Sequence, residues 1–255
     1  MCRGEMMISR ETLEDRYKAL AQAQGVELEV MYRSGLPKVQ EIEESDGGFR
    51  IRLDAGRISG EEYGEYLAYN VRKVLLPRLR LETDRVILRR FQRGDGEDCF
   101  PLFSSREDAY LDGGIFFERM DGAFDRLMDS WADPGQTRYV LELKETGRVI
   151  GTINLFDGDM RAVDTREIGY AVVPEYRRNG YAFEALSTLL HYLLYDLDLG
   201  LVTAGVDPGN APSIRLLEKL GFCSEGIRHK AFWNEIRGPV DLMYYYLEKA
   251  GGPAK

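Results

Sequence analysis

The sequence predicts an α/β protein in which short strands alternate with amphipathic helices along most of the chain. Residues 26–32 alternate apolar and polar side chains, which is typical of a strand with one buried face. Residues 138–144 and 149–156 are two further strand-like segments joined by a turn that contains Gly147, and this spacing predicts a hairpin. Residues 182–194 carry a wide apolar stripe at helical spacing, which indicates a helix buried against a sheet.

Residues 1–80 predict a small α/β unit. A helix is expected at residues 10–24, followed by strands at 26–32 and 49–53. The turn residues between these strands are Gly35, Pro37, Asp46, Gly47 and Gly48. Ser59 can cap a second helix that runs to about residue 76. We identify no family for this unit. It is either a packing extension of the main domain or a module for dimerisation or for recognition of a partner.

Residues 81–255 predict a second, larger domain. Its strands are expected at residues 86–91, 138–144, 149–156, 166–173, 201–206, 222–229 and 240–247. Residues 94–133 predict helices interrupted at Gly113 and Gly114, and a short helix over residues 213–220 is stopped by Gly221.

The composition is that of a soluble globular protein and excludes several function classes. The chain has 255 residues, of which 44% are hydrophobic and 30% charged, so it can build one large domain or two. No apolar run is long enough to span a membrane, and the N-terminus lacks the apolar centre of a secretion signal. The three cysteines show no metal-ligand spacing, so we expect reduced thiols, a cytoplasmic location and no bound metal.

The net charge and the small number of histidines limit which partners and metal sites are expected. The formal net charge is −9, which argues against nucleic acid because a phosphate backbone requires a basic surface. The same charge favours, weakly, a cationic partner such as an amine. Only two histidines occur, His191 and His229, which excludes an HExxH zinc site and most three-histidine metal sites. We expect both histidines to be structural.

The most informative stretch is residues 167–190, EIGYAVVPEYRRNGYAFEALSTLL. It predicts a strand, a tight turn and an apolar helix, an arrangement that aims several backbone N–H groups at one point and suits a phosphate. Gly180 allows the backbone to approach a ligand closely, and Arg177 and Arg178 add positive charge. These residues alone leave open whether the turn binds an anion or is an ordinary strand-turn-helix corner with solvated arginines.

A second segment, DPGNAPSIRLLEKLGF at residues 207–222, completes a pattern. Together the two segments resemble the GNAT superfamily of acetyl-CoA-dependent N-acetyltransferases. Arg177 to Ala182 match its pyrophosphate loop, Arg/Gln-x-x-Gly-x-Gly/Ala, and the second segment matches the Asn…Ser…Glu-Lys-x-Gly-Phe element beside the pantetheine arm. The form of the second motif is most similar to the RimJ/RimL-type branch of ribosomal-protein N-terminal acetyltransferases, which also holds spermidine and some small-molecule acetyltransferases. The resemblance covers roughly residues 81–249.

The resemblance implies a mixed, mostly antiparallel central sheet flanked by helices, with residues 1–80 as an α/β extension. It also implies transfer of an acetyl group from acetyl-CoA, without a metal, to a primary amine by direct attack in a ternary complex. A peptide N-terminus, a polyamine or another small amine would be the acceptor, and the protein could act as a homodimer. The alternatives are a non-catalytic acyl-CoA-binding module whose N-terminal unit recruits a partner, and a protein that binds another phosphate-bearing ligand.

The resemblance assigns cosubstrate-binding roles to both motifs. The backbone N–H groups expected to hold the pyrophosphate are those of Arg178, Asn179, Gly180, Tyr181 and Ala182. Val172 and Val173 are expected to pair with the pantetheine amides as a neighbouring strand would, and Asn210 is expected to bind pantetheine through its amide. A backbone N–H near Val172 or Val173 would then meet the thioester oxygen, and one such donor is worth about 2.7–4 kcal/mol in the transition state.

Glu167 is the candidate general base, acting directly or through water, because it lies on the strand that presents Val172. The alternative is a solvated carboxylate or a partner of nearby arginines. Asp207 and Asp241 are reserve candidates that we expect to be structural.

The expected general acid is missing from the usual place. Many family members carry a tyrosine in the helix after the asparagine motif, where this chain has Leu217. Ser213 is the remaining hydroxyl near the expected position of the sulfur. A CoA thiol has a pKa near 8.5, so the thiolate can leave almost unaided.

Overall fold

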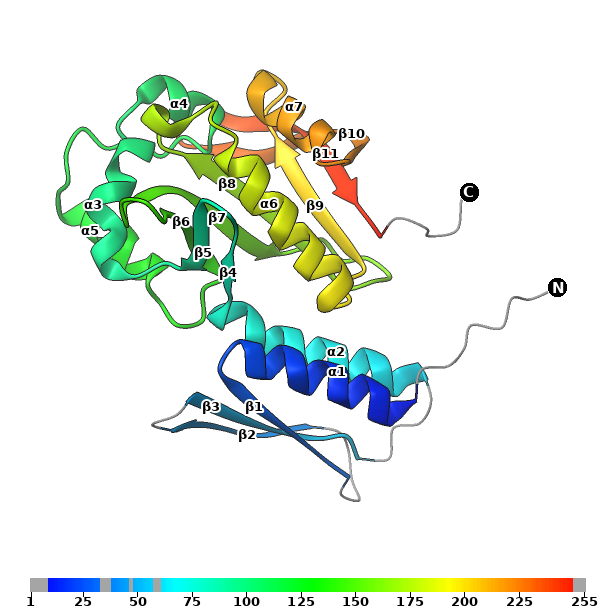
Figure 1. The fold of residues 1–255 in the computed structure, drawn as a ribbon. Coiled ribbons are helices and arrows are strands. Elements are labelled where there is room, and N and C mark those ends of the chain that lie inside the picture. Colours follow the sequence, from blue (N-terminus) through cyan, green and yellow to red (C-terminus); the bar gives the residue numbers. More distant parts are fainter. Residues whose placement is uncertain (1–8, 33–37, 46–47, 57–60, 250–255) are drawn as a thin grey trace. The chain divides into compact units, whose positions relative to one another are not determined.

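The computed structural model describes residues 9–32, 38–45, 48–56 and 61–249. The chain divides into two compact units, Met1–Arg78 and Leu79–Lys255 (Figure 1). The sequence placed this boundary after residue 80, whereas Arg80 already begins a strand of the larger sheet. Within the described residues, no helix is both long and apolar enough to cross a membrane.

The smaller unit contains two α-helices and a three-stranded sheet. Its elements are α1 (Arg10–Ala23), β1 (Val26–Met31), β2 (Lys38–Ser45), β3 (Gly48–Asp54), α2 (Glu61–Leu75) and the 3₁₀ turn η1 (Leu76–Arg78). The strand order is β1-β3-β2, with β1 parallel and β2 antiparallel to β3. Both predicted helices and both predicted strands are confirmed. The predicted cap Ser59 lies outside the described residues, as do the predicted turn residues Gly35, Pro37, Asp46 and Gly47.

The sequence did not predict β2. Its segment, KVQEIEES, places the apolar residues Val39 and Ile42 three positions apart, which breaks the period of two expected for a strand. The pairing of β2 with β3 contains a register shift between Val39 and Glu41. A bulge of this kind adds one residue to a strand, so the apolar spacing becomes odd and the sequence signal is lost.

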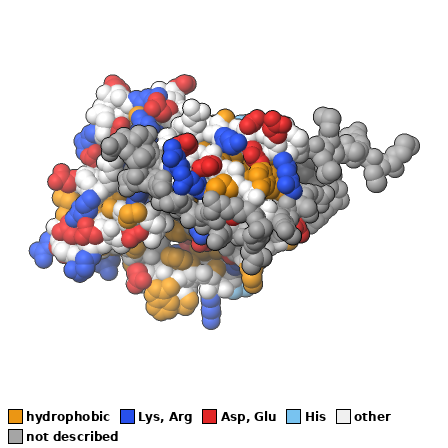
Figure 2. Space-filling view, turned by 90° about the horizontal axis from the view of Figure 1, so that it is seen from below, with side chains coloured by type: hydrophobic (Ala, Val, Ile, Leu, Met, Phe, Trp, Pro, Cys, Tyr) orange, Lys and Arg blue, Asp and Glu red, His pale blue; other side chains and the backbone are white. Residues whose placement is uncertain are grey.

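The sheet of the smaller unit has one apolar and one charged face. Buried apolar side chains from the sheet and the helices are Tyr17, Ala21, Val26, Leu28, Ile51, Leu53, Leu67, Val71 and Leu75. On the alternate positions, Arg50 pairs with Glu27 at 2.7 Å. One step along the parallel ladder, Arg52 pairs with Glu29 at 2.9 Å. Figure 2 shows acidic and basic side chains interspersed on one face of the molecule.

The larger unit is built on an eight-stranded sheet. The strands are β4 (Arg80–Glu82), β5 (Val86–Arg90), β6 (Arg138–Leu143), β7 (Val149–Asp157), β8 (Thr165–Val172), β9 (Leu201–Val206), β10 (Cys223–Asn234) and β11 (Gly238–Leu247). Their order is β10-β11-β9-β8-β7-β6-β5-β4, and only β8 and β9 run parallel. The predicted mixed, mostly antiparallel sheet is confirmed, and all seven predicted strands are present beside the short β4.

Helices connect these strands. The helices and helical turns are η2 (Arg93–Asp95), α3 (Gly96–Cys99), η3 (Phe100–Leu102), α4 (Arg106–Leu111), α5 (Gly122–Trp131), η4 (Pro174–Tyr176), α6 (Tyr181–His191), the π-helical turn η5 (Tyr192–Asp196) and α7 (Ala211–Lys219). Gly113 and Gly114 follow α4 with φ angles of +79° and +82°, so the predicted interruption is confirmed.

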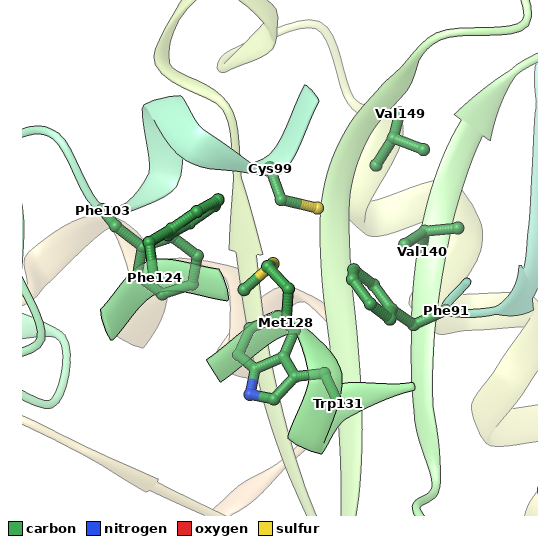
Figure 3. Close-up of a cluster of buried hydrophobic side chains, with 8 residues drawn as sticks. All are labelled: Phe91, Cys99, Phe103, Phe124, Met128, Trp131, Val140 and Val149. Carbon is green, nitrogen blue, oxygen red and sulfur yellow. The ribbon is translucent and has the colours of Figure 1, made fainter. Parts of the chain in front are cut away.

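Both faces of the larger sheet are covered. On one face, side chains from α3 and α5 pack against β6 and β7, and Figure 3 shows this cluster with Cys99, Met128, Trp131, Val140 and Val149. Tyr139, the neighbour of Val140 on β6, points to the opposite face and is also fully buried. On that second face α6 packs against β5 and β8.

Candidate active site

The larger sheet opens between its two parallel strands. β8 pairs with β9 only from Thr165 to Glu167, although β8 continues to Val172. β9 continues to Val206 and stays paired there with β11. The two strands therefore diverge beyond Glu167, and β8 loses its neighbour on that side. Backbone N–H and C=O groups along such an edge require partners from side chains, water or a ligand.

The turn after β8 leads into the N-terminus of α6. Gly180 is the N-cap residue, with a φ of +83° and no side-chain cap. Asn179 holds the turn together by donating from its amide to the carbonyls of Tyr176 and Arg177 at 3.2 and 3.1 Å. The first N–H groups of a helix have no partner within the helix, and a glycine cap leaves them open. With the helix dipole, they form a site for an anion.

This turn, the free edge of β8 and α7 border a cleft of about 610 Å³, which we name the first cleft. Its size is in the range of sites for small molecules and cofactors. The predicted site residues that line it are Val172, Arg177, Arg178, Gly180, Tyr181, Ala182, Asn210 and Ser213. Of the other predicted residues, Asn179 lies in the turn itself, Val173 is buried, and Glu167 lies outside this cleft.

Arg177 is already engaged within the protein. Its Nε donates to the carbonyl of Val172 at 2.9 Å, and its two Nη atoms contact the Asp108 carboxylate at 3.0 and 2.9 Å. Arg178 also lines the cleft, and among the described residues no carboxylate pairs with it. Arg178 is therefore the arginine of the motif that can meet an anion without breaking an ion pair. Asp108 was not predicted from the sequence because it lies in α4, far from the motif.

The register of β8 separates the two predicted valines. The N–H of Val173 donates to the carbonyl of Ile150 at 2.9 Å, so it is used within the protein. Alternate residues of an antiparallel pair turn their backbone groups to opposite sides. The N–H groups of Val172 and Tyr170 therefore face away from β7, toward the gap beside β9. Of the two valines, Val172 is the one whose N–H faces this gap, and its contact with a thioester stays a prediction.

Asn210 and Ser213 lie at the N-terminus of α7. The side-chain oxygen of Asn210 accepts from the Ser213 N–H at 3.2 Å and caps the helix. The Asn210 amide nitrogen donates to Asp112 at 2.9 Å. Both ends of the amide predicted to bind pantetheine are thus used inside the protein. The pKa of Asp112 is raised to about 6 because protein around the cleft displaces water and Asp108 lies nearby.

Two hydroxyl groups lie close together in the first cleft, and only one of them, that of Ser213, was predicted from the sequence. The hydroxyl of Ser213 lies 2.7 Å from the hydroxyl of Tyr170, on β8. Burial raises the pKa of Tyr170 to about 12, so this phenol keeps its proton at neutral pH. Leu217, at the position where many relatives have a tyrosine, is buried and does not line the cleft. The sequence signal for Tyr170 is its place in EIGYAVV, three residues after Glu167 on the same strand.

Glu167 lies on the opposite face of the sheet from Tyr170, because side chains alternate along a strand. Burial, and then the nearby Asp159, raise the pKa of Glu167 above the ordinary value of 4.5, while Arg228 and a hydrogen bond from Tyr244 oppose the shift. Tyr244 also borders a second cleft of about 570 Å³, which we name the second cleft. Its lining residues are Asp159, Met160, Arg161, Glu225, Gly226, Ile227, Arg228 and Tyr244.

The reserve residues have structural partners. Asp207 is buried, pairs with Arg237 and accepts from the Gly209 N–H at 2.8 Å. Asp241 accepts from the Lys230 N–H and contacts His229, each at 2.8 Å.

His191 is the last residue of α6 and stacks on Tyr195, with ring centroids 4.9 Å apart. His229 lies inside β10 rather than near its end. Neither histidine lines either cleft.

A mixed sheet that splits beside a helix N-terminus without a side-chain cap is suited to hold a phosphate-bearing ligand against a strand edge. Comparison with known proteins agrees. The family model described as an acetyltransferase (GNAT) domain matches residues 85–223. The chain therefore belongs to the GNAT family of acetyl-CoA-dependent N-acetyltransferases. The matched segment begins within the larger unit.

Individual relatives cover the same region. The uncharacterized N-acetyltransferase YoaA of Bacillus subtilis is 33% identical over 172 residues, which are 66% of this chain and 96% of that protein. A GNAT-family acetyltransferase from Bacillus anthracis is similar in fold, with a TM-score of 0.58, 24% identity and coverage of 67% of this chain and 98% of that one. RimJ of Mycobacterium smegmatis, solved in complex with CoA-disulfide, has a TM-score of 0.50 at 22% identity and covers 64% of this chain and 81% of that chain.

Proposed function

We propose that the protein transfers the acetyl group of acetyl-CoA to a primary amine by direct attack in a ternary complex, in the gap between β8 and β9. The observation that carries this proposal is the divergence of the two strands beyond Glu167. The first cleft reaches this gap along β8, and Glu167 lies on the other face of the same strand. A thioester held in the first cleft would then be reached by an amine from the face of Glu167.

The first cleft suits the cosubstrate. The open N–H groups at Gly180, Tyr181 and Ala182 would hold the pyrophosphate with the help of Arg178. The two pantetheine amides would pair with backbone groups of Tyr170 and Val172 that face away from β7, as an added strand does. The Val172 N–H would then donate to the thioester oxygen, a contact that gains strength as the oxygen acquires negative charge in the transition state.

Glu167 would remove the proton from the attacking amine, directly or through water. A protein α-amine has a pKa near 8 and is partly neutral at neutral pH, whereas a lysine-type amine near 10.4 is almost fully protonated. A carboxylate with a raised pKa is a better base than an ordinary one, provided that it stays ionised at the working pH. The burial of Glu167 supplies that shift.

The hydroxyl pair in the first cleft would assist the leaving group. Tyr170 and Ser213 share a hydrogen bond of 2.7 Å and both line the cleft. A proton held on either hydroxyl could be passed to the CoA thiolate, which would compensate for the leucine at position 217. Direct attack also agrees with the cysteines: of the described residues, Cys99 and Cys223 are free thiols, and neither lines either cleft.

Calorimetric titration with acetyl-CoA, with ATP as the control, tests the cosubstrate half of the proposal. We expect micromolar binding of acetyl-CoA and none of comparable strength for ATP. An acceptor screen with peptides and polyamines, followed by release of free CoA thiol, tests the transfer half. Tight binding without any turnover would favour the alternative of a non-catalytic acyl-CoA-binding module, with the smaller unit as its recruiting part.

A further inference from the structure

The face of the sheet that carries Glu167 also carries an arginine on β6. Arg138 is directly paired with Asn154 on β7, and Asn154 with Gly169 on β8. Directly paired residues share a face, and so do residues two positions apart on one strand. Arg138, Asn154 and Glu167 therefore project from the same side of the sheet.

The guanidinium of Arg138 is held by aromatic rings rather than by a carboxylate. It lies 4.5 Å from the ring centroid of Trp131 and 5.7 Å from that of Phe156. Its hydrogen bond goes to the side-chain oxygen of Asn154, at 3.1 Å. Among the described residues no acidic group forms an ion pair with it, and burial lowers its pKa below the usual range. The charge is thus fixed in place and partly dehydrated without an opposite charge.

Two other half-buried arginines of this unit have the ion pairs that Arg138 lacks. Arg89, on the neighbouring strand, contacts Asp95 at 2.8 Å and Glu142 at 2.6 Å. Arg166 contacts Asp164 at 3.0 Å. A partly dehydrated cation without a counter-charge is costly, and cation–π contacts recover only part of that cost. Such a group is well prepared to bind an anion supplied by a ligand.

The space between Arg138 and Glu167 is accessible. Phe156 lies between them because it is directly paired with Glu167 and its ring is near both Arg138 and Gly169. Phe156 remains 43% exposed, and Met160, in the loop after β7, is fully exposed. A ligand on this face could therefore rest on the Phe156 ring while reaching both charged groups.

We propose that Arg138 binds an anionic group of the acceptor, so that the acceptor is a primary amine that carries a carboxylate or similar anion at a distance from its nitrogen. Arg138 and Glu167 lie two strand spacings, about 10 Å, and two residues apart on the sheet, and the reach of their side chains shortens the span that the acceptor must bridge. This inference rests on the proposed function, because it takes Glu167 as the place of the amine. Two sources supply the chemistry: a peptide with an acidic residue at its first or second position, and a small amino acid with a distant carboxylate. The net charge of −9 weakly disfavours an anionic acceptor at long range, whereas the contact with Arg138 is local.

The test compares matched acceptors at saturating acetyl-CoA. Each pair differs only in charge: a peptide beginning Ser-Glu against one beginning Ser-Gln, and a small ω-amino acid against its amide. One of the two pairs, peptide or small molecule, should resemble the natural acceptor. Within that pair we expect kcat/KM to be about ten- to a hundredfold higher for the acidic acceptor than for the neutral one, mainly because its KM is lower. Arg138→Gln should remove this preference by lowering kcat/KM for the acidic acceptor toward that for the neutral one, and Arg138→Glu should reverse it toward a cationic acceptor.

Two controls keep the result interpretable. Arg148→Gln removes an exposed arginine that is paired with Asp98, and it should preserve the preference. Arg138→Lys keeps the charge and should retain part of the preference even if the glutamine variant folds poorly. Equal rates for acidic and neutral acceptors, or a preference that survives Arg138→Gln, would overturn the anion site and leave the acetyl transfer standing. Absence of turnover with every amine would contradict both the anion site and the proposed acetyl transfer.

Discussion

The two faces of the larger sheet differ in how they build a site. In the first cleft, the groups proposed to hold the cosubstrate are mainly backbone groups of a strand edge, a glycine turn and the start of a helix. The face of Glu167 depends on side chains from three strands, which come together only through register. Under the proposed function, the backbone groups would hold the one cosubstrate, whereas the side chains on the face of Glu167 would select the acceptor. The difference suggests that substitutions on the two faces will affect different kinetic constants.

The largest effect is expected at Glu167. Glu167→Gln removes the base while keeping the shape, so kcat should fall by about 10²–10⁴-fold with acetyl-CoA affinity unchanged. In the wild type, kcat/KM should fall as the pH drops through an apparent pKa above 4.5, because only the ionised carboxylate accepts a proton and burial raises its pKa. Rate measurements from pH 5 to 9 with an α-amine acceptor check both the loss of kcat in Glu167→Gln and the pH dependence of kcat/KM in the wild type. A variant with near-normal kcat would assign Glu167 a structural role.

The next effect concerns the backbone of the first cleft. Gly180→Ala places a Cβ at a φ of +83°, 3.4 Å from Arg85 Nη2, in the turn that carries the open N–H groups, and acetyl-CoA affinity should fall about ten- to a hundredfold. Gly147→Ala is the matched control, since it has a φ of +70° in the β6–β7 turn with no atom near its added Cβ. Both variants should lose about 1–2 kcal/mol of stability from left-handed strain. Calorimetry should find weakened binding only at Gly180, and equal binding losses would contradict the anion site.

A smaller effect is expected from the hydroxyl pair. Tyr170→Phe should lower kcat about five- to tenfold at constant acetyl-CoA affinity, because the ring stays but the proton donor is lost. Ser213→Ala should act similarly, and the double variant should be little worse than either single one, since the two hydroxyls share one hydrogen bond. Additive losses would indicate that the two groups act independently.

The smallest effect is expected in the smaller unit. Arg50→Gln breaks an exposed ion pair with Glu27, and such pairs contribute about 0–1 kcal/mol. Thermal unfolding should therefore move little, and both kcat and KM should stay unchanged. A large change in KM for a peptide acceptor would instead support the prediction that this unit takes part in recognition.

The sequence predicted what depends on neighbouring residues. The turn from Arg177 to Ala182 is contiguous, so its glycine, its arginines and the following helix are visible in one short motif. The same is true of the β6–β7 hairpin and of α7, which ends just before the predicted stop residue Gly221, although its cap Asn210 was predicted to bind pantetheine instead. Local chemistry fixes these elements, and tertiary packing leaves them unchanged.

Contacts between distant segments could not be predicted. The Arg177–Asp108 pair, the Tyr170–Ser213 contact and the position of Arg138 beside Phe156 each join residues far apart in the chain. The last two depend on strand register, because a shift of β8 or β6 by one residue would turn Tyr170 or Arg138 to the other face of the sheet. The bulged β2 was missed for a related reason, because its extra residue breaks the alternation that marks a strand.

Initial-velocity kinetics with acetyl-CoA and an acceptor varied together test the central claim most directly. If the cosubstrate in the first cleft is attacked by an amine from the opposite face of the same strand, both substrates must be bound at once, and double-reciprocal plots should intersect. Parallel lines, with an acetylated enzyme trapped when acetyl-CoA is added alone, would show a covalent intermediate and contradict direct attack across the gap between β8 and β9.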